Sequence, residues 1–414
     1  MGVSALDDLR ASRMVEMAEE IGAASGGDGV AADSVEELAW LLTPEARIEA
    51  LLEAASTKRD AATGDTLSFS PKVFVDLTRL CRDRCSYCTF VRTPLAERIP
   101  LRGEKAGAGE PKPYLEQDEV LEIALAGARA GCKEALFTLG DRPEDRYESA
   151  RRFLSDRGYS STAEYVTACA RLVLDEAKLL PHVNPGVMTA DEIAEYRKVS
   201  ASAGLMLEST SRALFEDPGG CHYGSPDKDP DVRLACIADA GRAKVPFTTG
   251  MLIGIGESLI DRVETILAMA SLAREFGHIQ EVIVQNFRAK PASPMRSHLE
   301  PEFDEYLRVI ALARLILPAR VAVQAPPNLT PEYEGLLAAG MSDWGGISPV
   351  TPDHVNPEAP WPEVAELAKR CAHLGFALRS RLALHPSFVI EGGWVDPAVE
   401  GRVLEMSDSQ GWAL

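Results

Sequence analysis

The sequence predicts an α/β protein built around a (β/α)8 barrel. From residue 72 onward, short apolar runs alternate with helical stretches, and Gly or Pro bounds many of the runs. Eight such alternations within roughly 280 residues match a (β/α)8 barrel in count and length. A doubly wound open sheet is the alternative, but no phosphate-loop or dinucleotide fingerprint follows the first run. The expected strands are residues 72–77, 134–140, 179–186, 204–210, 245–254, 281–289, 320–326 and 343–348.

The same pattern divides the chain into three parts. Residues 1–66 are expected to form a helical N-terminal extension that caps the barrel, and residues 67–355 the barrel itself. Helical stretches lie between the expected strands; "QDEVLEIALAGARAG", for example, ends on Gly131 as the C-terminus of a helix does. Residues 356–414 are expected to add one amphipathic helix and a tail packed on the barrel.

Composition and charge exclude several classes of protein. The 414 residues carry a formal net charge of −20, which argues against a nucleic-acid or anionic-membrane binder because phosphates are met by clustered Lys and Arg. No apolar run approaches the roughly 18 residues that a membrane helix needs. The start, "MGVSALDDLR", lacks a basic segment followed by an apolar one. We therefore expect a cytoplasmic protein with no nucleic-acid or membrane partner.

The polar residues after each expected strand are the first candidates for chemistry, because a barrel carries its active site on these loops. Three cysteines follow the first strand, "GDRPE" the second, "NPG" the third and "ESTSR" the fourth. Residues 92–113 then form a long polar loop, and loops of this length in a compact domain are often functional lids. We expect this loop to close the mouth of the barrel.

Cys81, Cys85 and Cys88 form a C-x3-C-x2-C cluster, whereas the other five of the eight cysteines are scattered. A structural zinc site takes four ligands, and no second Cys/His pair lies nearby. A chance cluster of packing residues is another alternative. A 4Fe-4S cluster fits the spacing better, because three thiolates leave one iron open for a further ligand. Cationic side chains that suit an anionic cluster surround the trio, namely Arg79, Arg82, Arg84 and Arg92.

The trio and its neighbour Tyr87 resemble the C-x3-C-x-aromatic-C signature of radical S-adenosylmethionine (SAM) enzymes. In that family the signature follows the first strand of a TIM-type barrel. The resemblance implies that SAM chelates the open iron and that Tyr87 lies beside it. An external donor then reduces the cluster, and SAM is cleaved to methionine and a 5'-deoxyadenosyl radical, which abstracts hydrogen from the substrate.

Other stretches match this family where it binds SAM. "LGDRPE" stands where the family has a glycine-rich acidic stretch for the methionine amino group, although the usual GGE is absent. The end of the fourth strand meets the ribose or the substrate. "GMLIGIGE" matches the family's G-x-I-x-G-x-x-E beside the adenine, with Leu for Ile. The resemblance thus implies SAM contacts from Gly140, Asp141, Glu144, Glu208, Ser209, Arg212, Gly250, Leu252, Gly254 and Gly256.

Longer phrases narrow the resemblance. "HYGSPDKDP", "VIVQNFRAKP" and "DWGGISPVTPDHVNPEAPWP" are similar to the CofG-type half of 7,8-didemethyl-8-hydroxy-5-deazariboflavin (FO) synthase, within residues 68–395. The resemblance implies a partner, the CofH-type half, that joins tyrosine to 5-amino-6-(D-ribitylamino)uracil. The chain would then act as a carbon-nitrogen lyase, abstracting hydrogen from this adduct and closing the ring with loss of ammonia to give FO.

Such a substrate needs polar partners for its uracil edge and ribityl hydroxyls, and an apolar wall for its phenol ring. The catalytic residue is unassigned; His222 and Tyr223 are the candidates for proton transfer, since histidine titrates near neutral pH. By their position at strand ends, the candidate substrate residues are His182, Asn184, Asp227, Gln285, Asn286, Arg288, Asp353 and His354.

Two other interpretations stay open at this point. One is a different radical SAM cyclase or synthase, such as a biotin-synthase-like, thiazole-forming or menaquinone-pathway enzyme. The other is a non-catalytic metal-binding scaffold stabilised by zinc, which predicts zinc rather than iron and no 5'-deoxyadenosine.

Overall fold

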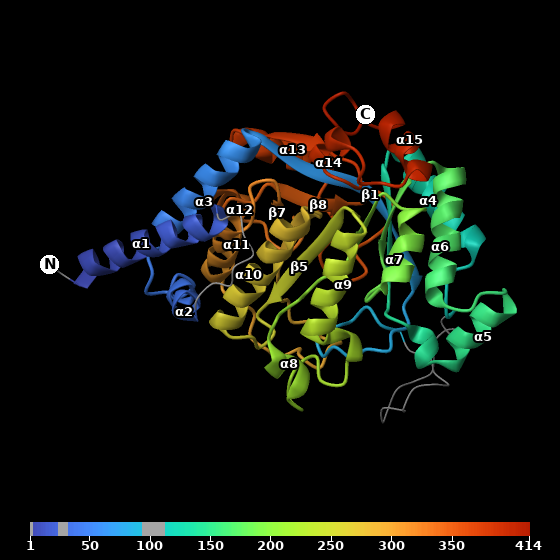
Figure 1. Ribbon diagram of the computed structural model, residues 1–414, viewed down its shortest axis with the longest axis horizontal. Helices are drawn as coiled ribbons and strands as arrows, with labels where there is room; N and C mark the ends of the chain where they lie inside the picture. Colours follow the sequence, from blue (N-terminus) through green and yellow to red (C-terminus); the bar gives the residue numbers. More distant parts are fainter. Residues whose placement is uncertain (1–2, 24–31, 93–111) are drawn as a thin grey trace.

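The centre of the protein is a closed barrel of eight parallel strands (Figure 1). The computed structural model describes residues 3–23, 32–92 and 112–414. Each barrel strand pairs with the next in sequence, and β1 pairs with both β2 and β8, which closes the ring. The predicted barrel is confirmed and the open sheet is wrong. The strands are β1 (Thr66–Thr78), β2 (Glu134–Leu139), β3 (Leu180–Asn184), β4 (Ser202–Gly204), β5 (Phe247–Ile253), β6 (Ile279–Asn286), β7 (Ala322–Gln324) and β8 (Asp343–Ile347).

The strand bounds differ most from prediction at β1 and β4. β1 begins six residues before the predicted 72–77, because Ser68, Ser70 and Pro71 pair with β8. β4 has only three residues, against the predicted 204–210. Its chain leaves the extended conformation at Glu208, whose φ is +67°, so that only an isolated bridge from Glu208 to Met251 continues the pairing.

Helices surround the barrel, with their apolar faces on the strands (Figure 1). The predicted 117–131 helix forms as α4 (Gln117–Arg129) and ends before Gly131, whose φ of +84° suits a glycine. α4 packs closely on β1, since a Cβ at Gly127 would lie 2.8 Å from Val73. The other barrel helices are α5 (Glu148–Asp156), α6 (Thr162–Leu172), η3 (Val173–Ala177), α7 (Ala190–Arg197), α8 (Arg212–Glu216), α9 (Pro230–Arg242), α10 (Leu259–Phe276), α11 (Phe303–Ile316) and α12 (Tyr333–Ala338), with short turns η2 (Pro143–Asp145) and η4 (Pro226–Lys228).

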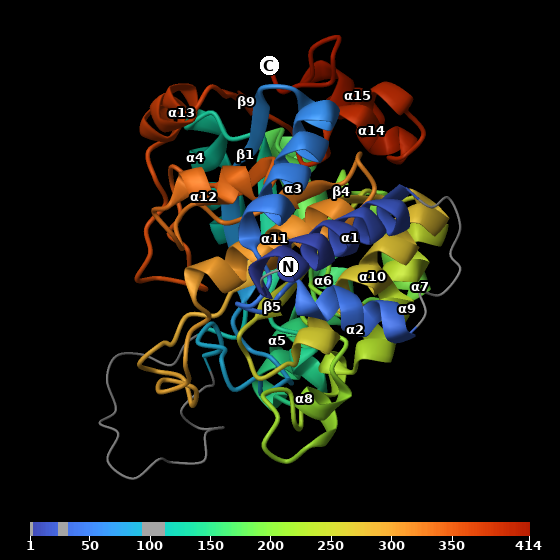
Figure 2. The same ribbon diagram turned by 90° about the vertical axis from the view of Figure 1, so that its left-hand side faces the viewer.

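Three N-terminal helices lie against the outer surface of this helical layer (Figure 2). They are α1 (Val3–Ala23), α2 (Ala32–Trp40) and α3 (Ile48–Thr63). Lys58 donates to the carbonyls of Leu315 and Leu317 at 2.6 and 3.0 Å, and Arg59 to that of Leu337 at 2.6 Å. These bonds satisfy carbonyls at the C-terminal ends of α11 and α12. The N-terminal helices therefore cover the side of the barrel formed by α10, α11 and α12.

The C-terminal segment adds a ninth strand that the sequence pattern did not predict. After α13 (Val364–His373), β9 (Ala377–Ser380) pairs in parallel with Thr66–Phe69 of β1. Residues 381–385 then cross the N-terminal ends of the barrel strands, where the Ser202 hydroxyl and the Gln280 amide donate to the Ala383 carbonyl. Leu382 and Leu384 are buried there. The chain continues through α14 (Pro386–Glu391) and α15 (Pro397–Glu405).

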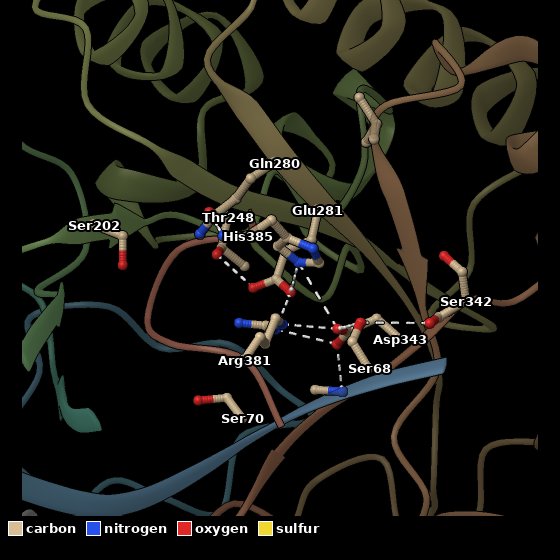
Figure 3. Close-up of polar contacts among 12 residues, drawn as sticks. Ser68, Ser70, Ser202, Thr248, Gln280, Glu281, Ser342, Asp343, Arg381 and His385 are labelled. Atoms are coloured by element: carbon tan, nitrogen blue, oxygen red, sulfur yellow. Dashed lines mark hydrogen bonds and ion pairs between the residues drawn. The ribbon is translucent and has the colours of Figure 1, made fainter. Parts of the chain in front are cut away.

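Arg381 is the centre of the polar contacts at this end of the barrel (Figure 3). Its guanidinium is buried, donates to Asp343 at 2.7 and 3.1 Å, and pairs with Glu281. Thr248 also donates to Glu281 at 2.7 Å, and the His385 ring lies 3.3 Å from it. Burial alone would raise the pKa of Glu281, but Arg381, His385 and Lys72 together outweigh burial and hold that pKa well below its usual value. The cation thus gives both buried carboxylates a hydrogen-bonded counter-charge.

None of the helices in the described part of the chain combines the length and apolarity needed to cross a bilayer.

We predict that Arg381→Met will strongly destabilise the protein, because it leaves Glu281 and Asp343 buried without a counter-charge. Removing one partner of a buried ion pair typically costs about 3–5 kcal/mol. Chemical denaturation, followed by far-ultraviolet circular dichroism, measures the loss. Arg152→Met is the matched control, since Arg152 and its partner Glu148 are both 70% exposed; its cost should stay below about 1 kcal/mol. Equal stability of the two variants would contradict the central role of Arg381.

Candidate active site

The three clustered cysteines lie in the loop that follows β1, at the C-terminal end of the barrel. All three are free thiols and half-buried. The Asp141 N–H donates to Cys81 Sγ at 3.2 Å, and the Cys88 N–H donates to the Cys85 carbonyl at 3.1 Å, which makes a tight turn between the last two cysteines. Burial raises the pKa of Cys85 to about 11 and raises that of Cys81 further. Burial thus favours the protonated form of Cys81 and Cys85, whereas a bound metal would take them as thiolates.

The spread of the three sulfur atoms favours several metal ions over one. In the described part of the chain, the sulfur atoms of Cys81, Cys85 and Cys88 do not all lie within 4.8 Å of one another. Sulfurs around one zinc ion would lie about 3.8 Å apart, given Zn–S bonds of about 2.3 Å. The spacing and the chemistry of the donors therefore fit an iron-sulfur cluster, whose ligands attach to different irons.

The loop after β2 packs directly under the cysteine loop. A Cβ at Gly140 would lie 1.9 Å from the Leu80 carbonyl oxygen and 2.6 Å from Cys81 Cβ, so only glycine fits there. The Arg82 N–H donates to the Asp141 carbonyl at 2.9 Å, and the Tyr147 hydroxyl to the Cys81 carbonyl at 3.2 Å. Two loops that lie about 60 residues apart in the sequence are thus held together by contacts between their backbones.

Asp141 and Glu144, both expected to receive the methionine amino group, have different surroundings. One Asp141 oxygen accepts from the Val187 N–H at 2.8 Å, while the other, buried, has no hydrogen-bond partner among the described residues. Burial raises the pKa of Asp141 to about 7, and the nearby Asp227 adds to this. Both Glu144 oxygens accept from Thr162 at the start of α6, one of them at 2.8 Å from its N–H. Asp141 is therefore the carboxylate with a free acceptor.

Arg82 and Asp227 join the cysteine loop to the loop after β4. The Arg82 guanidinium pairs with both Asp227 oxygens and with Asp145. In the same loop, Ser225 Oγ accepts from the Arg84 N–H at 2.8 Å and lies 3.9 Å from Cys85 Sγ. Asp227, expected as a substrate residue, has its carboxylate engaged by Arg82. Ser225 had no signal of its own in the sequence, because its partners lie about 140 residues away.

Tyr87 contacts His222 and an apolar cluster. The Tyr87 hydroxyl lies 3.1 Å from His222 Nε2, with the rings in an edge-on contact at 5.6 Å. Burial lowers the pKa of His222 to about 3, so its ring is neutral at physiological pH. Tyr87 also packs on the cluster that contains Leu252 and Phe287. Tyr223, the other proton-transfer candidate, has a side chain that is 52% exposed.

Glu208 links the ends of β4 and β5. Its N–H donates to the Gly250 carbonyl, and its own carbonyl accepts from the Leu252 N–H, each at 3.0 Å. Its carboxylate accepts from Lys228 at 2.6 Å, and both side chains are mostly buried. Burial would raise the pKa of Glu208, but Lys228 and Arg233, with a smaller effect from His222, together outweigh burial and lower that pKa. The neighbouring Ser209 is buried, whereas Arg212 is 46% exposed and pairs with Glu216 and Asp231 on the surface.

The glycine-rich end of β5 forms a backbone surface beside Tyr87 and Leu252. A Cβ at Gly250 would lie 2.3 Å from the Ile283 carbonyl oxygen of β6. Gly254 and Gly256 have φ values of +86° and +112°, which L side chains rarely adopt. The carboxylate of Glu257 accepts from the N–H groups of Gly254 and Ile255 at 2.7 and 2.8 Å. Glu257 therefore fixes the shape of this turn.

The remaining substrate candidates lie at different depths in the barrel. His182 is buried low in the barrel, 2.7 Å from the Ser202 hydroxyl, and burial lowers its pKa to about 4. Asn184 and Gln285 are half-buried on β3 and β6, and Asn286 is buried. Arg288 is 45% exposed and pairs with Glu300.

Asp353 and His354 lie beside β1. Asp353 accepts from Asn328 and Asn356, each at 3.0 Å, and His354 Nε2 lies 3.5 Å from Asp76 Oδ2. Asp76 and Lys228 are polar residues of this region that were not singled out in the sequence. Alternation along the first strand could have identified Asp76 as facing the barrel interior. Of the predicted lid, residues 92–113, the stretch 93–111 is not among the residues that the structure describes.

Comparisons with known proteins identify a family model and relatives that match this chain. The family model of the radical SAM superfamily matches residues 75–269. An FO synthase of Nocardia farcinica is 50% identical over 389 residues, covering 92% of this chain and 44% of that protein. The chain thus spans less than half the length of that relative. A 7,8-didemethyl-8-hydroxy-5-deazariboflavin synthase of Methanopyrus kandleri is 49% identical over 348 residues, covering 84% of this chain and 99% of that protein.

Solved structures support the fold alone. The [FeFe]-hydrogenase maturase HydG has a TM-score of 0.67 at 17% identity, covering 90% of this chain and 76% of that one. Methylornithine synthase (PylB) has a TM-score of 0.62 at 16% identity, covering 88% and 97%.

We predict that Gly140→Ala will impair metal loading, because the added methyl group forces the Leu80 carbonyl and Cys81 away from the loop after β2. Iron and sulfide content after anaerobic reconstitution measures the effect, and we expect less than about half of the wild-type content. Gly219→Ala is the control, since nothing lies within 4 Å of its Cβ position. Wild-type iron content in Gly140→Ala would show that the contact is not needed.

Proposed function

The chain belongs to the radical SAM superfamily, within the family of FO synthases, and from this premise we propose that it is the CofG-type component of FO synthase. It would abstract one hydrogen atom from the hydroxybenzyl/ribityl-diaminouracil adduct. Ring closure with loss of ammonia, together with loss of one further electron to an external acceptor and of one proton to solvent, would then give FO. The 49% identity to the M. kandleri deazariboflavin synthase carries the proposal, because this chain spans 99% of that protein.

The proposed site holds a 4Fe-4S cluster on Cys81, Cys85 and Cys88, with SAM as the cosubstrate. Cluster and SAM together, when bound, would supply the 5'-deoxyadenosyl radical and leave methionine. The protein supplies binding and exclusion of water. The free oxygen of Asp141, next to Cys81, would accept a hydrogen bond from the methionine amino group. The Arg82–Asp227 pair would hold the two surrounding loops in place.

The adenosine moiety would lie along the end of β5. Tyr87 and Leu252 offer an apolar contact for the adenine, and Gly254 and Gly256 let it approach the backbone. Glu208, kept ionised by Lys228, would accept hydrogen bonds from the ribose. His222 would position Tyr87 through the hydroxyl contact rather than transfer protons, because its low pKa keeps it neutral.

A CofH-type half is the proposed partner, since it would supply the adduct, and an external donor would supply the electron. More than half of the N. farcinica FO synthase lies outside the region that matches this chain, which leaves room for a second catalytic half in that protein.

We predict that the reconstituted protein forms FO under anaerobic conditions with SAM, dithionite, tyrosine, the diaminouracil and a CofH-type protein. FO fluorescence and 5'-deoxyadenosine, separated by chromatography, are the readouts. Cys85→Ala should abolish both products and the iron content, because one cluster ligand is lost. Cys132→Ala, which changes a buried cysteine far from the trio, should retain them.

The outcomes separate the rival functions. SAM cleavage without FO would indicate a different radical SAM enzyme. Zinc in place of iron, with no 5'-deoxyadenosine, would indicate a metal-stabilised scaffold.

A further inference from the structure

The inward face of β1 near the cysteines is only partly covered by other protein atoms. Phe74 and Asp76 are half-buried, whereas their neighbours Val73, Val75 and Leu77 are fully buried against the outer helices. Because side chains alternate along a strand, Phe74 and Asp76 share the inward face. Their partners on β2, Leu136 and Thr138, are half-buried as well. These side chains therefore keep some exposed surface on the inward side of the strands.

The segment after β8 covers this face of β1. Thr351 Oγ1 accepts from the Phe74 N–H at 3.0 Å, so the segment runs beside the strand. Asp353 fixes its course by accepting from the N–H groups of Val355 and Asn356 at 2.9 and 3.0 Å. A further hydrogen bond, from the Asn328 amide to the Ala359 carbonyl at 2.9 Å, holds the end of the segment. The side chains that it carries are thus preorganised.

Trp361, at the end of this segment, stacks on Phe74. The ring centroids lie 5.3 Å apart with an interplanar angle of 8°. The indole Nε1 is buried and has no hydrogen-bond partner among the described residues. Asp76 Oδ2 is buried in the same way, with His354 Nε2 at 3.5 Å as its polar neighbour. An unsatisfied buried polar group costs about 1–3 kcal/mol, so two of them beside an aromatic pair indicate a polar ligand.

We propose that Phe74, Trp361, Asp76 and His354 bind the hydroxyphenyl end of the adduct. The phenol ring would pack against the aromatic pair, and its hydroxyl would bond to the Asp76–His354 pair. This inference rests on the proposed function and adds the substrate group that the β1 side of the barrel recognises. A pyrimidine presents several carbonyl and N–H groups and would need more polar partners than this wall offers. A phenol needs aromatic contact and one polar pair.

The charges around Asp76 suit this role. Burial raises the pKa of Asp76 to about 7; the Arg79 cation opposes this rise and Asp353 adds to it. Burial also lowers the pKa of His354. Near neutral pH the pair can therefore both donate a hydrogen bond to a phenol and accept one from it.

A binding experiment on the reconstituted full chain uses p-cresol, toluene and uracil as probes in saturation-transfer NMR. The first two differ only in the hydroxyl group. We expect wild type to bind p-cresol more tightly than toluene, and Trp361→Leu to weaken p-cresol binding by about tenfold. Asp76→Ala should remove the preference for p-cresol over toluene. Trp394→Leu is the matched control, because Trp394 pairs with Phe388 at 4.9 Å in the C-terminal segment.

Kinetics with the adduct supply the second readout. Trp361→Leu should raise the KM for the adduct by about tenfold and leave substrate-free formation of 5'-deoxyadenosine unchanged. A folding defect would reduce the formation of 5'-deoxyadenosine as well. Trp361→Phe keeps the stacking and loses the N–H, so its KM should rise less.

Two results would overturn the proposal. One is wild-type p-cresol binding and KM in both Trp361→Leu and Asp76→Ala; the other is loss of uracil binding instead of p-cresol binding. Absence of FO with the wild-type protein would refute the proposed function separately, since p-cresol binding does not depend on turnover.

Discussion

The barrel depends on one buried cation, the guanidinium of Arg381. It balances the negative charges of two carboxylates at the N-terminal end of the barrel, Glu281 of β6 and Asp343 of β8. Two buried carboxylates this close would repel each other without it. Because these polar groups pair with one another and residues 381–385 cover them, this end of the barrel is filled. A ligand would therefore enter from the opposite end, where the inward side chains of β1 and β2, namely Phe74, Asp76, Leu136 and Thr138, are only half-buried.

The parts of the fold that local pattern determines could be predicted from the sequence. Apolar runs of strand length, separated by helices, were enough for the eight-stranded barrel. β9 was missed because "ALRS" has no apolar alternation, and its stability comes from pairing with β1, about 310 residues earlier. β4 was predicted too long because its apolar run continues to Leu207, while the positive φ of Glu208 is set by contacts with β5.

The same limit applies to the candidate site. The three cysteines and Tyr87 lie within eight residues, so a spacing rule finds them. The residues that surround them come from distant loops, and no local pattern identifies Ser225, Lys228 or Trp361. The resemblance proposes both Asp141 and Glu144 for the same role, and only the structure shows that the Glu144 oxygens accept from Thr162 at the start of a helix. A residue's partners are set by the barrel topology.

β1 connects the two parts of the proposed chemistry. Its inward face carries Phe74 and Asp76, and the cysteine loop begins directly after it, with Cys81 five residues beyond Asp76. A strand that is paired on both sides moves little, so it fixes the separation between the proposed metal site and the proposed substrate wall. Hydrogen abstraction requires the radical carbon and the C–H bond to approach within about 3–3.5 Å. Placing both sites on one rigid element gives that positioning without a moving part.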